Sequence, residues 1–125
     1  MKRYRIVSHR DLMAEMIAVA RGEIRAPADA GTRSFESLDV FLGFLTPVNR
    51  DLLAAIRDRK PRSIAELAEM TGLGEPALAE TLAKLEAVGF VRMEMAAGRK
   101  LPVVAVTSIR VEIDPFSLND RVEMV

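Results

Sequence analysis

The side chains best suited to contact another molecule lie between residues 62 and 100 of this sequence, and most of them carry a charge. Lysine and arginine neutralise phosphates, a glutamate can accept a hydrogen bond from the amino group of cytosine, and an alanine can touch the methyl group of thymine. Together with their neighbours on the two helices and the hairpin described below, such residues give the candidate DNA contacts Arg62, Ser63, Glu75, Pro76, Ala77, Glu80, Thr81, Lys84, Arg92, Arg99 and Lys100. Carboxylates oppose phosphate binding, so the glutamates in this set predict weakened contacts with DNA.

Catalysis is not expected from this sequence. The single histidine, His9, lies among arginines without a second type of metal ligand close by, whereas a metal site needs several such ligands. The segment Gly72-Leu73-Gly74 is too short for a phosphate-binding loop and does not follow a predicted strand. We therefore expect a protein that is not an enzyme, with no catalytic residue, no metal and no cofactor.

Two short helices must position the candidate contacts. Ser63 and Glu66 have the spacing of a capping box at the start of the first helix, and Gly72 and Gly74 end it in a tight turn. The second helix spans about residues 75–88, and its apolar stripe consists of Leu78, Leu82 and Leu85. Two helices joined by a short glycine-containing turn are typical of the DNA-binding helix-turn-helix.

A hairpin is predicted directly after the second helix. Residues 90–95 alternate apolar and polar side chains, as a half-buried strand does, and residues 103–107 form a second β-branched run. Between them, residues 96–102 predict a turn with Arg99 and Lys100 at its tip. A hairpin in this place predicts the wing of a winged helix. The alternative is an ordinary helical hairpin packed on a β-hairpin that binds no nucleic acid, with basic residues that serve only solubility.

The composition restricts the remaining possibilities. The chain has 125 residues, half of them apolar, which suffices for one domain with a core. It has no cysteine, no apolar run long enough to span a membrane and no signal peptide, so we expect a cytoplasmic protein without a membrane partner. Its 18 basic and 18 acidic residues leave no net charge, which counts against a dedicated, tight DNA binder.

The N-terminal part predicts a short strand over residues 4–7, a helix over about residues 9–21 and a linker over residues 22–34. The segment 35–45 then predicts a helix that is apolar nearly all round, and such a helix must be widely buried. We therefore expect a homodimer. Its predicted interface consists of Phe35, Leu38, Phe41, Leu42, Phe44, Leu45, Met13 and Ile17. The alternative is that the N-terminal helix covers this segment within the same chain.

A further helix is predicted to begin at Thr46, which can cap it, with Pro47 at its first position. Its predicted core face consists of Val48, Leu52, Ala55 and Ile56. It ends in the basic segment 57–62, which could meet phosphates or act as a partner for the carbonyl end of the helix. The alternation over residues 110–113 predicts a last strand, followed by a loosely ordered end.

Four segments of the chain carry a resemblance to known proteins: SFESL (residues 34–38), LTPVNRDLL (45–53), PRSIAELA (61–68) and LEAVGFV (85–91). Over about residues 35–113 the chain resembles a family of predicted prokaryotic winged helix-turn-helix transcriptional regulators. These are small MarR- or ArsR-like proteins, some of which look like antitoxins. The resemblance implies sequence-specific binding of double-stranded DNA as a dimer and a regulatory role, neither of which the composition indicates.

The sequence as a whole predicts an α+β, mainly α fold, namely a winged helix-turn-helix with an N-terminal helical extension. We expect an arm and linker over residues 1–33, the winged helix-turn-helix over residues 34–113 and a tail over residues 114–125. The expected function is a DNA-binding transcriptional regulator, a repressor, that acts as a homodimer with its recognition helix at about 75–88 and its wing at about 91–107. The alternative is a winged-helix protein-interaction module or antitoxin-like protein that binds a partner protein such as a toxin, with weak or no DNA binding.

Overall fold

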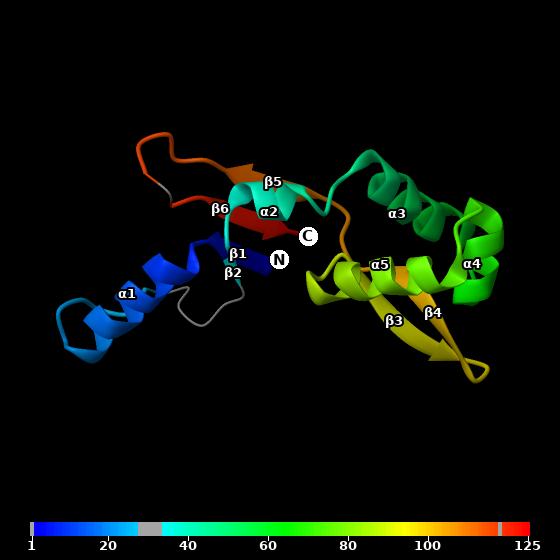
Figure 1. Ribbon diagram of the computed structural model, residues 1–125, viewed down its shortest axis with the longest axis horizontal. Coiled ribbons are helices and arrows are strands. Elements are labelled where there is room, and N and C mark those ends of the chain that lie inside the picture. Colours follow the sequence, from blue (N-terminus) through cyan, green and yellow to red (C-terminus); the bar gives the residue numbers. More distant parts are fainter. Residues whose placement is uncertain (1, 28–33, 118) are drawn as a thin grey trace. The chain divides into compact units, whose positions relative to one another are not determined.

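The computed structural model describes residues 2–27, 34–117 and 119–125. Within them the fold is mixed α/β, with five helices and two small sheets (Figure 1). The chain forms two compact units. The helical unit consists of residues 44–107, and the sheet unit combines residues 1–43 with residues 108–125. No helix in the described part of the chain is both long and apolar enough to cross a membrane.

The helical unit contains three helices followed by a two-stranded antiparallel sheet: α3 (Pro47–Arg59), α4 (Ile64–Thr71), α5 (Glu75–Ala87), β3 (Val91–Ala96) and β4 (Arg99–Val104). The predicted helix starts are confirmed. Thr46 accepts a hydrogen bond from the backbone N–H of Asn49 at 3.1 Å, and Ser63 accepts one from Glu66 at 3.0 Å. These caps satisfy backbone donors that have no partner within the first turn. Lys60 ends α3 in the left-handed region, with a φ of 46°.

The core of the helical unit is formed by apolar side chains of all three helices and of the start of the hairpin: Leu52, Ile56, Leu67, Leu78, Leu82, Leu85, Val88, Phe90 and Val91. The predicted leucine stripe of α5 is confirmed, since all three of its leucines are buried. Phe44 packs edge-on against Phe90, with ring centroids 6.5 Å apart. The prediction of Val48 as a core residue is wrong: α3 contacts α4 and β4 and buries Leu52 and Ile56, whereas Val48 in its first turn is 62 % exposed.

The hairpin of β3 and β4 turns over only two residues, Ala97 and Gly98, whose φ angles are 52° and 76°. Two positive φ angles give the turn a twist that matches the right-handed twist of the strands. The prediction of a turn over residues 96–102 and a strand over residues 103–107 is therefore wrong. β4 begins at Arg99, and its backbone pairs with β3 up to the turn itself.

The sheet unit contains four strands and two helices: β1 (Lys2–Ile6), α1 (His9–Ala20), β2 (Ser34–Phe35), α2 (Leu38–Leu42), β5 (Ile109–Glu112) and β6 (Arg121–Met124). The strand order is β2-β1-β6-β5, with β1 and β2 parallel and the other pairs antiparallel. The predicted N-terminal strand and helix are confirmed. The prediction of a loosely ordered C-terminal end is wrong, because β6 pairs with a strand on each side.

The sheet of this unit has one apolar face and one charged face, because successive side chains of a strand alternate in direction. The buried residues of the apolar face are Tyr4, Ile6, Val122 and Met124. Phe35 packs on Tyr4 at a ring distance of 5.6 Å, and Phe41 packs on Phe35 at 4.9 Å. The charged face carries Arg3, Arg5, Arg110, Glu112, Arg121 and Glu123.

The prediction of one helix over residues 35–45 is wrong. Phe35 lies in β2 and pairs with β1. Ser37 has an extended backbone and caps the short helix α2 by accepting a hydrogen bond from the N–H of Val40 at 3.2 Å. A helix cannot begin before its own cap residue. Phe35 and Phe41 are therefore buried in the sheet unit, whereas Val40 remains exposed.

The predicted boundaries after residues 33 and 113 do not coincide with the observed division into units. Strand pairing joins β1 to β2 and to β6, and β6 to β5, so both ends of the described chain belong to one sheet. These are contacts between residues far apart in sequence. Local patterns of side chains do not reveal such contacts, which explains the difference.

Candidate functional site

The turn between α4 and α5 is held by one threonine. The hydroxyl of Thr71 donates a hydrogen bond to the carbonyl of Leu67 at 2.8 Å and accepts one from the N–H of Leu73 at 3.4 Å. Gly72 occupies the left-handed region with a φ of 72°, which glycine adopts without strain. The two helices are thus joined through a short turn with a defined backbone.

The outward side of α5 carries the candidate contacts predicted on this helix. Glu75, Pro76, Ala77, Glu80 and Lys84 are all exposed, whereas Thr81 is half-buried. Glu80 and Lys84, one turn apart, form an ion pair at 3.5 Å between side chains that are both more than half exposed. Such a pair contributes about 0.3–0.5 kcal/mol to the helix. The larger effect of this pair is electrostatic: Lys84, the single lysine of α5, neutralises the charge of Glu80.

The basic residues of the hairpin do not all lie together. Cross-strand partners share one face of a two-stranded sheet, so Arg92, Glu94 and Arg99 lie on one face. Arg92 is paired with Glu94 at 3.0 Å. Lys100 lies opposite Met95 on the other face. The two basic residues predicted at the tip of the hairpin therefore point to different sides.

The basic segment after α3 is partly neutralised within the chain. Arg57 forms an ion pair with Asp58 at 2.7 Å, and this hydrogen bond lowers the pKa of the Asp58 carboxyl below its ordinary value. Arg59 donates a hydrogen bond to the backbone carbonyl of Met70 at 3.2 Å. These two arginines therefore form contacts within the helical unit, although neither of these bonds goes to a carbonyl group at the end of α3.

Lys60 and Arg62 remain available beside them. Both are exposed, and in the described part of the chain neither forms an ion pair. A cleft of about 380 Å³ lies between this segment and β4, and it is lined by Ile56, Arg57, Lys60, Pro61, Arg62, Leu101, Pro102, Val103 and Val104. Sequence reasoning selects Arg62 but misses Lys60 as a single candidate. No pattern in the sequence distinguishes Lys60 from Arg57 and Arg59, because the difference lies in the bonds that these two arginines form in the folded unit.

The predicted dimer residues have different surroundings. Phe35 and Phe41 are buried, and Leu38, Phe44 and Leu45 are half-buried. The remaining three, Leu42, Met13 and Ile17, are exposed. None of the residues of α1 is buried, and Met16 is exposed as well. The exposed apolar surface of the sheet unit therefore lies on α1 more than on the segment 35–45.

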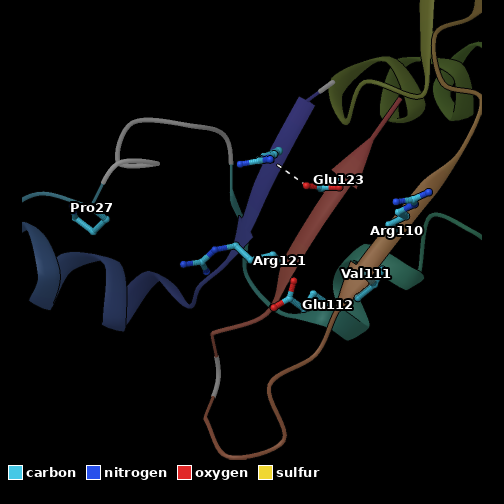
Figure 2. A pocket seen from close by; sticks show the side chains of 7 residues that line it. Pro27, Arg110, Val111, Glu112, Arg121 and Glu123 are labelled. Atoms are coloured by element: carbon cyan, nitrogen blue, oxygen red, sulfur yellow. Dashed lines mark ion pairs between the residues drawn. The ribbon is translucent and has the colours of Figure 1, made fainter.

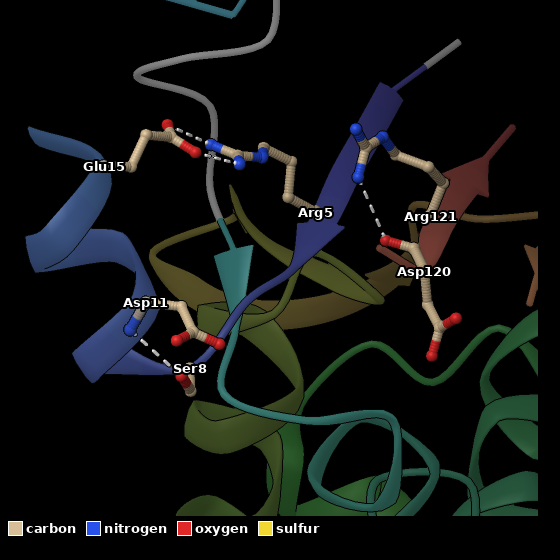
Figure 3. A network of polar contacts seen from close by, with 6 residues as sticks. All are labelled: Arg5, Ser8, Asp11, Glu15, Asp120 and Arg121. Atoms are coloured by element: carbon tan, nitrogen blue, oxygen red, sulfur yellow. Dashed lines mark hydrogen bonds and ion pairs between the residues drawn. The ribbon is translucent and has the colours of Figure 1, made fainter. Parts of the chain in front are cut away.

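A charged contact joins α1 to the sheet. The guanidinium of Arg5 donates two hydrogen bonds to the carboxylate of Glu15 at 2.8 and 2.5 Å (Figure 3). These bonds lower the pKa of Glu15 and outweigh its partial burial, which acts in the opposite direction. Ser8 caps the same helix by accepting a hydrogen bond from the N–H of Asp11 at 3.1 Å. Both contacts fix the first turns of α1.

A cavity of about 760 Å³ lies beside the charged face of the sheet, and Figure 2 shows the side chains around it: Arg3, Pro27, Arg110, Val111, Glu112, Arg121 and Glu123. Arg3 pairs with Glu123 at 3.1 Å. Because the lining carries charges of both signs, it does not have the character of an anion site. Among the described residues no group of three or more histidines and carboxylates could hold a metal ion.

The helical unit is the part of the chain that resembles a known protein family. Residues 44–111, more than half of the chain, match the family model HVO_A0114. The chain belongs to the HVO_A0114 family. No curated protein and no solved structure matches it. The HVO_A0114 match covers the whole helical unit and ends within β5, so most of the sheet unit lies outside it.

Proposed function

We propose that this member of the HVO_A0114 family is a DNA-binding transcriptional regulator, a repressor, and that its helical unit is a winged helix-turn-helix. In this proposal α5 is the recognition helix, which enters the major groove, and the hairpin of β3 and β4 is the wing. The order of helix, tight turn, helix and hairpin supports this interpretation.

The observation that carries the proposal is the division of α5 into two sides. Leu78, Leu82 and Leu85 are buried in the core of the helical unit, so the orientation of the helix is fixed. The opposite side, which includes Ala77 and Glu80, is exposed along the length of the helix. A recognition helix needs one anchored side and one side that can reach base edges.

Phosphate contacts would come from residues outside α5. Lys60 and Arg62 precede α4, and Arg99 lies beside the turn of the hairpin. All three are exposed, and none forms an ion pair within the described residues. Cations flanking the recognition helix supply the part of DNA affinity that does not depend on sequence.

The proposal includes a homodimer formed through the sheet unit. Met13, Ile17, Leu42, Val111 and Ile113 are exposed apolar side chains of this unit, and a second copy would cover part of this apolar surface. Two copies would also place two recognition helices on one DNA molecule, which is the arrangement that helix-turn-helix dimers use on symmetric operators.

A protein-interaction module, for example an antitoxin-like protein that binds a toxin, is the second candidate. The observation that favours it is the charge of α5, where Glu75, Glu80 and Glu86 are accompanied by the single lysine Lys84. Carboxylates near phosphates weaken DNA binding. The apolar strand residues in the cleft beside Lys60 would suit a protein partner better than a nucleic acid.

Binding of the purified protein to its own upstream DNA tests the first candidate. We expect fluorescence anisotropy to show binding that weakens steeply between about 50 and about 200 mM salt, and that is tighter for the upstream fragment than for a scrambled fragment. The variant Lys60→Glu/Arg62→Glu should weaken binding to both fragments alike. Arg21→Glu, a charge reversal on an exposed residue of the sheet unit, is the matched control and should change little. Absence of binding at the lower salt concentration would favour the second candidate.

A further inference from the structure

The outer edge of β5 has no role in the proposed contacts with DNA. β5 is the last strand of its sheet and pairs with β6 on one side. Within the described residues no strand pairs with its other side. Such an edge presents backbone N–H and C=O groups in a row, to which another extended strand can bond.

The hydrogen bonds of β5 determine which residues present these groups. Ser108 and Val125 exchange two backbone hydrogen bonds, at 3.2 and 3.0 Å. Bonded and non-bonded positions alternate along an antiparallel pair, so Arg110 and Glu112 direct their backbone groups toward β6. The outward-directed groups belong to the residues that alternate with these: Ile109, Val111 and Ile113.

The side chains at this edge are also arranged in alternation. Arg110 and Glu112 extend from the charged face of the sheet (Figure 2), and neither forms an ion pair within the described residues. On the other face, Val111 is 37 % exposed and Ile113 is 58 % exposed. Val122, the partner of Val111 on β6, is fully buried. The apolar surface therefore continues beyond the part of the sheet that the chain itself covers.

We propose that β5 pairs in an antiparallel arrangement with β5 of a second copy of the chain, with the two Val111 residues opposite each other. This inference deepens the homodimer of the proposed function and rests on it for the existence of a second copy. The outward-directed groups permit three registers in which the two-fold axis passes through the middle of β5, namely those centred on Arg110, Val111 or Glu112. One places the two Arg110 side chains opposite each other, one places the two Glu112 side chains opposite each other, and only the register centred on Val111 pairs Arg110 with Glu112.

Charge selects among these registers. Opposite charges directly across an antiparallel pair stabilise it, and like charges destabilise it. In the register centred on Val111, both copies contribute one Arg110–Glu112 pair, and Ile109 lies opposite Ile113 on the apolar face. The outward backbone groups of these residues then all find partners. The two four-stranded sheets become one continuous sheet across a two-fold axis.

A second copy is the partner that this edge fits best, because the edge is complementary to itself. The segment Ile-Arg-Val-Glu-Ile reads as apolar, positive, apolar, negative, apolar, with Val111 at its centre. When a second copy is related to the first by a two-fold axis, each apolar residue of the segment lies opposite an apolar residue and each charge lies opposite the opposite charge. A partner strand of another protein would need this particular order of charges to pair equally well.

Two single charge reversals test the pairing. Arg110→Glu places glutamates opposite each other in the dimer, and Glu112→Arg places arginines opposite each other. We expect either change to raise the dimer dissociation constant about tenfold or more, measured by sedimentation equilibrium. An equimolar mixture of the two variants restores both charge pairs, and we expect dimers to reappear with nearly the wild-type dissociation constant. Mixing changes nothing within either chain, so effects of the substitutions on folding do not affect this comparison.

Arg99→Glu, a reversal on the hairpin of the helical unit, is the control and should leave the dissociation constant unchanged. A wild-type mass of one chain at micromolar concentration would overturn the proposed pairing. Single variants that dimerise as tightly as the wild type, or a mixture that does not recover the dimer, would also overturn it. DNA binding is measured separately, so a protein that binds its operator while its β5 variants stay dimeric would retain the proposed function and reject only the pairing at this edge.

Discussion

The helical unit and the sheet unit differ in how their longer helices bury apolar side chains. In the helical unit, α5 places three leucines in the core. In the sheet unit, α1 buries none of its residues, and its apolar side chains Met13 and Met16 are exposed. An ion pair of Arg5 with Glu15 joins α1 to the sheet. The difference teaches that the unit matched by the HVO_A0114 family is packed around α5, whereas the other unit keeps apolar surface that a partner can cover.

The largest expected effect is a loss of stability in the helical unit, and it tests the difference in burial between α5 and α1. Leu82→Ala removes a fully buried side chain from the core of the helical unit, and we expect it to lower the free energy of unfolding by about 2–5 kcal/mol. Ile17→Ala removes an exposed side chain from α1 and should change the unfolding free energy of the monomer by less than about 0.5 kcal/mol. Urea denaturation at low protein concentration measures both. Equal effects of the two substitutions would contradict the contrast.

Glu15→Gln tests the polar attachment of α1. The change leaves the mostly buried guanidinium of Arg5 without its carboxylate, and we expect it to cost about 1–3 kcal/mol at neutral pH. Because the pKa of Glu15 is lowered in the folded state, its stabilisation is present above the unfolded pKa and is lost as the pH falls through the folded pKa. The difference between wild type and variant should therefore shrink in acid. Denaturation curves at neutral pH and at about pH 3 measure it, and a difference independent of pH would refute the assigned cause.

Charge reversal of the hairpin tests whether the helical unit, in contrast to the sheet unit, contacts DNA phosphates. Arg99→Glu/Lys100→Glu should weaken DNA binding by about tenfold for all sequences alike and reduce the salt slope. Since the two residues lie on opposite faces of the hairpin, the single variants should differ, and the more damaging one identifies the face that meets DNA. Anisotropy titrations at two salt concentrations measure the effect. Unchanged affinity in the double variant would exclude the hairpin as a phosphate contact.

The smallest expected effect concerns the outward side of α5. Glu80→Gln removes one negative charge, keeps the shape of the side chain and releases Lys84 from its ion pair. We expect binding to every DNA sequence to become tighter by less than about tenfold, since a repelled carboxylate is removed. Weaker binding to the operator, with non-specific binding unchanged, would instead mean that Glu80 accepts a hydrogen bond from a cytosine. Parallel titrations with operator and scrambled fragments distinguish these results.

The elements that sequence reasoning predicted well are those specified by neighbouring residues. Thr46 and Ser63 cap the helices that they were expected to cap, and Leu78 and its partners form the expected buried stripe. Helix caps and apolar periodicity depend on side chains within one or two turns of each other. The candidate contacts on α5 were found for the same reason, because the exposed side of a helix follows from its buried side.

The elements that sequence reasoning misplaced are those specified by distant residues. Phe35 reads as part of a helix but lies in a strand, because β1 supplies its backbone partners from the other side of the linker. Val48 reads as a core residue but is exposed, because burial depends on which elements cover α3. Arg99 and Lys100 read as the tip of a turn, but the two-residue turn places both of them in β4, where successive side chains point to opposite faces. Lys60 as a free cation required knowledge of the bonds of its neighbours Arg57 and Arg59.

The place of β6 in the sheet has a consequence for the order in which the chain folds during its synthesis. All strand pairing of the helical unit, between β3 and β4, is complete once Val104 has left the ribosome. β1 is made before the other strands of its sheet, whereas its antiparallel partner β6 is made after them. The sheet unit must therefore wait for residues 121–124, while the helical unit between its two parts can fold beforehand. A chain that stops before Arg121 loses the pairing of both β1 and β5 with β6, and keeps every hydrogen bond between β3 and β4.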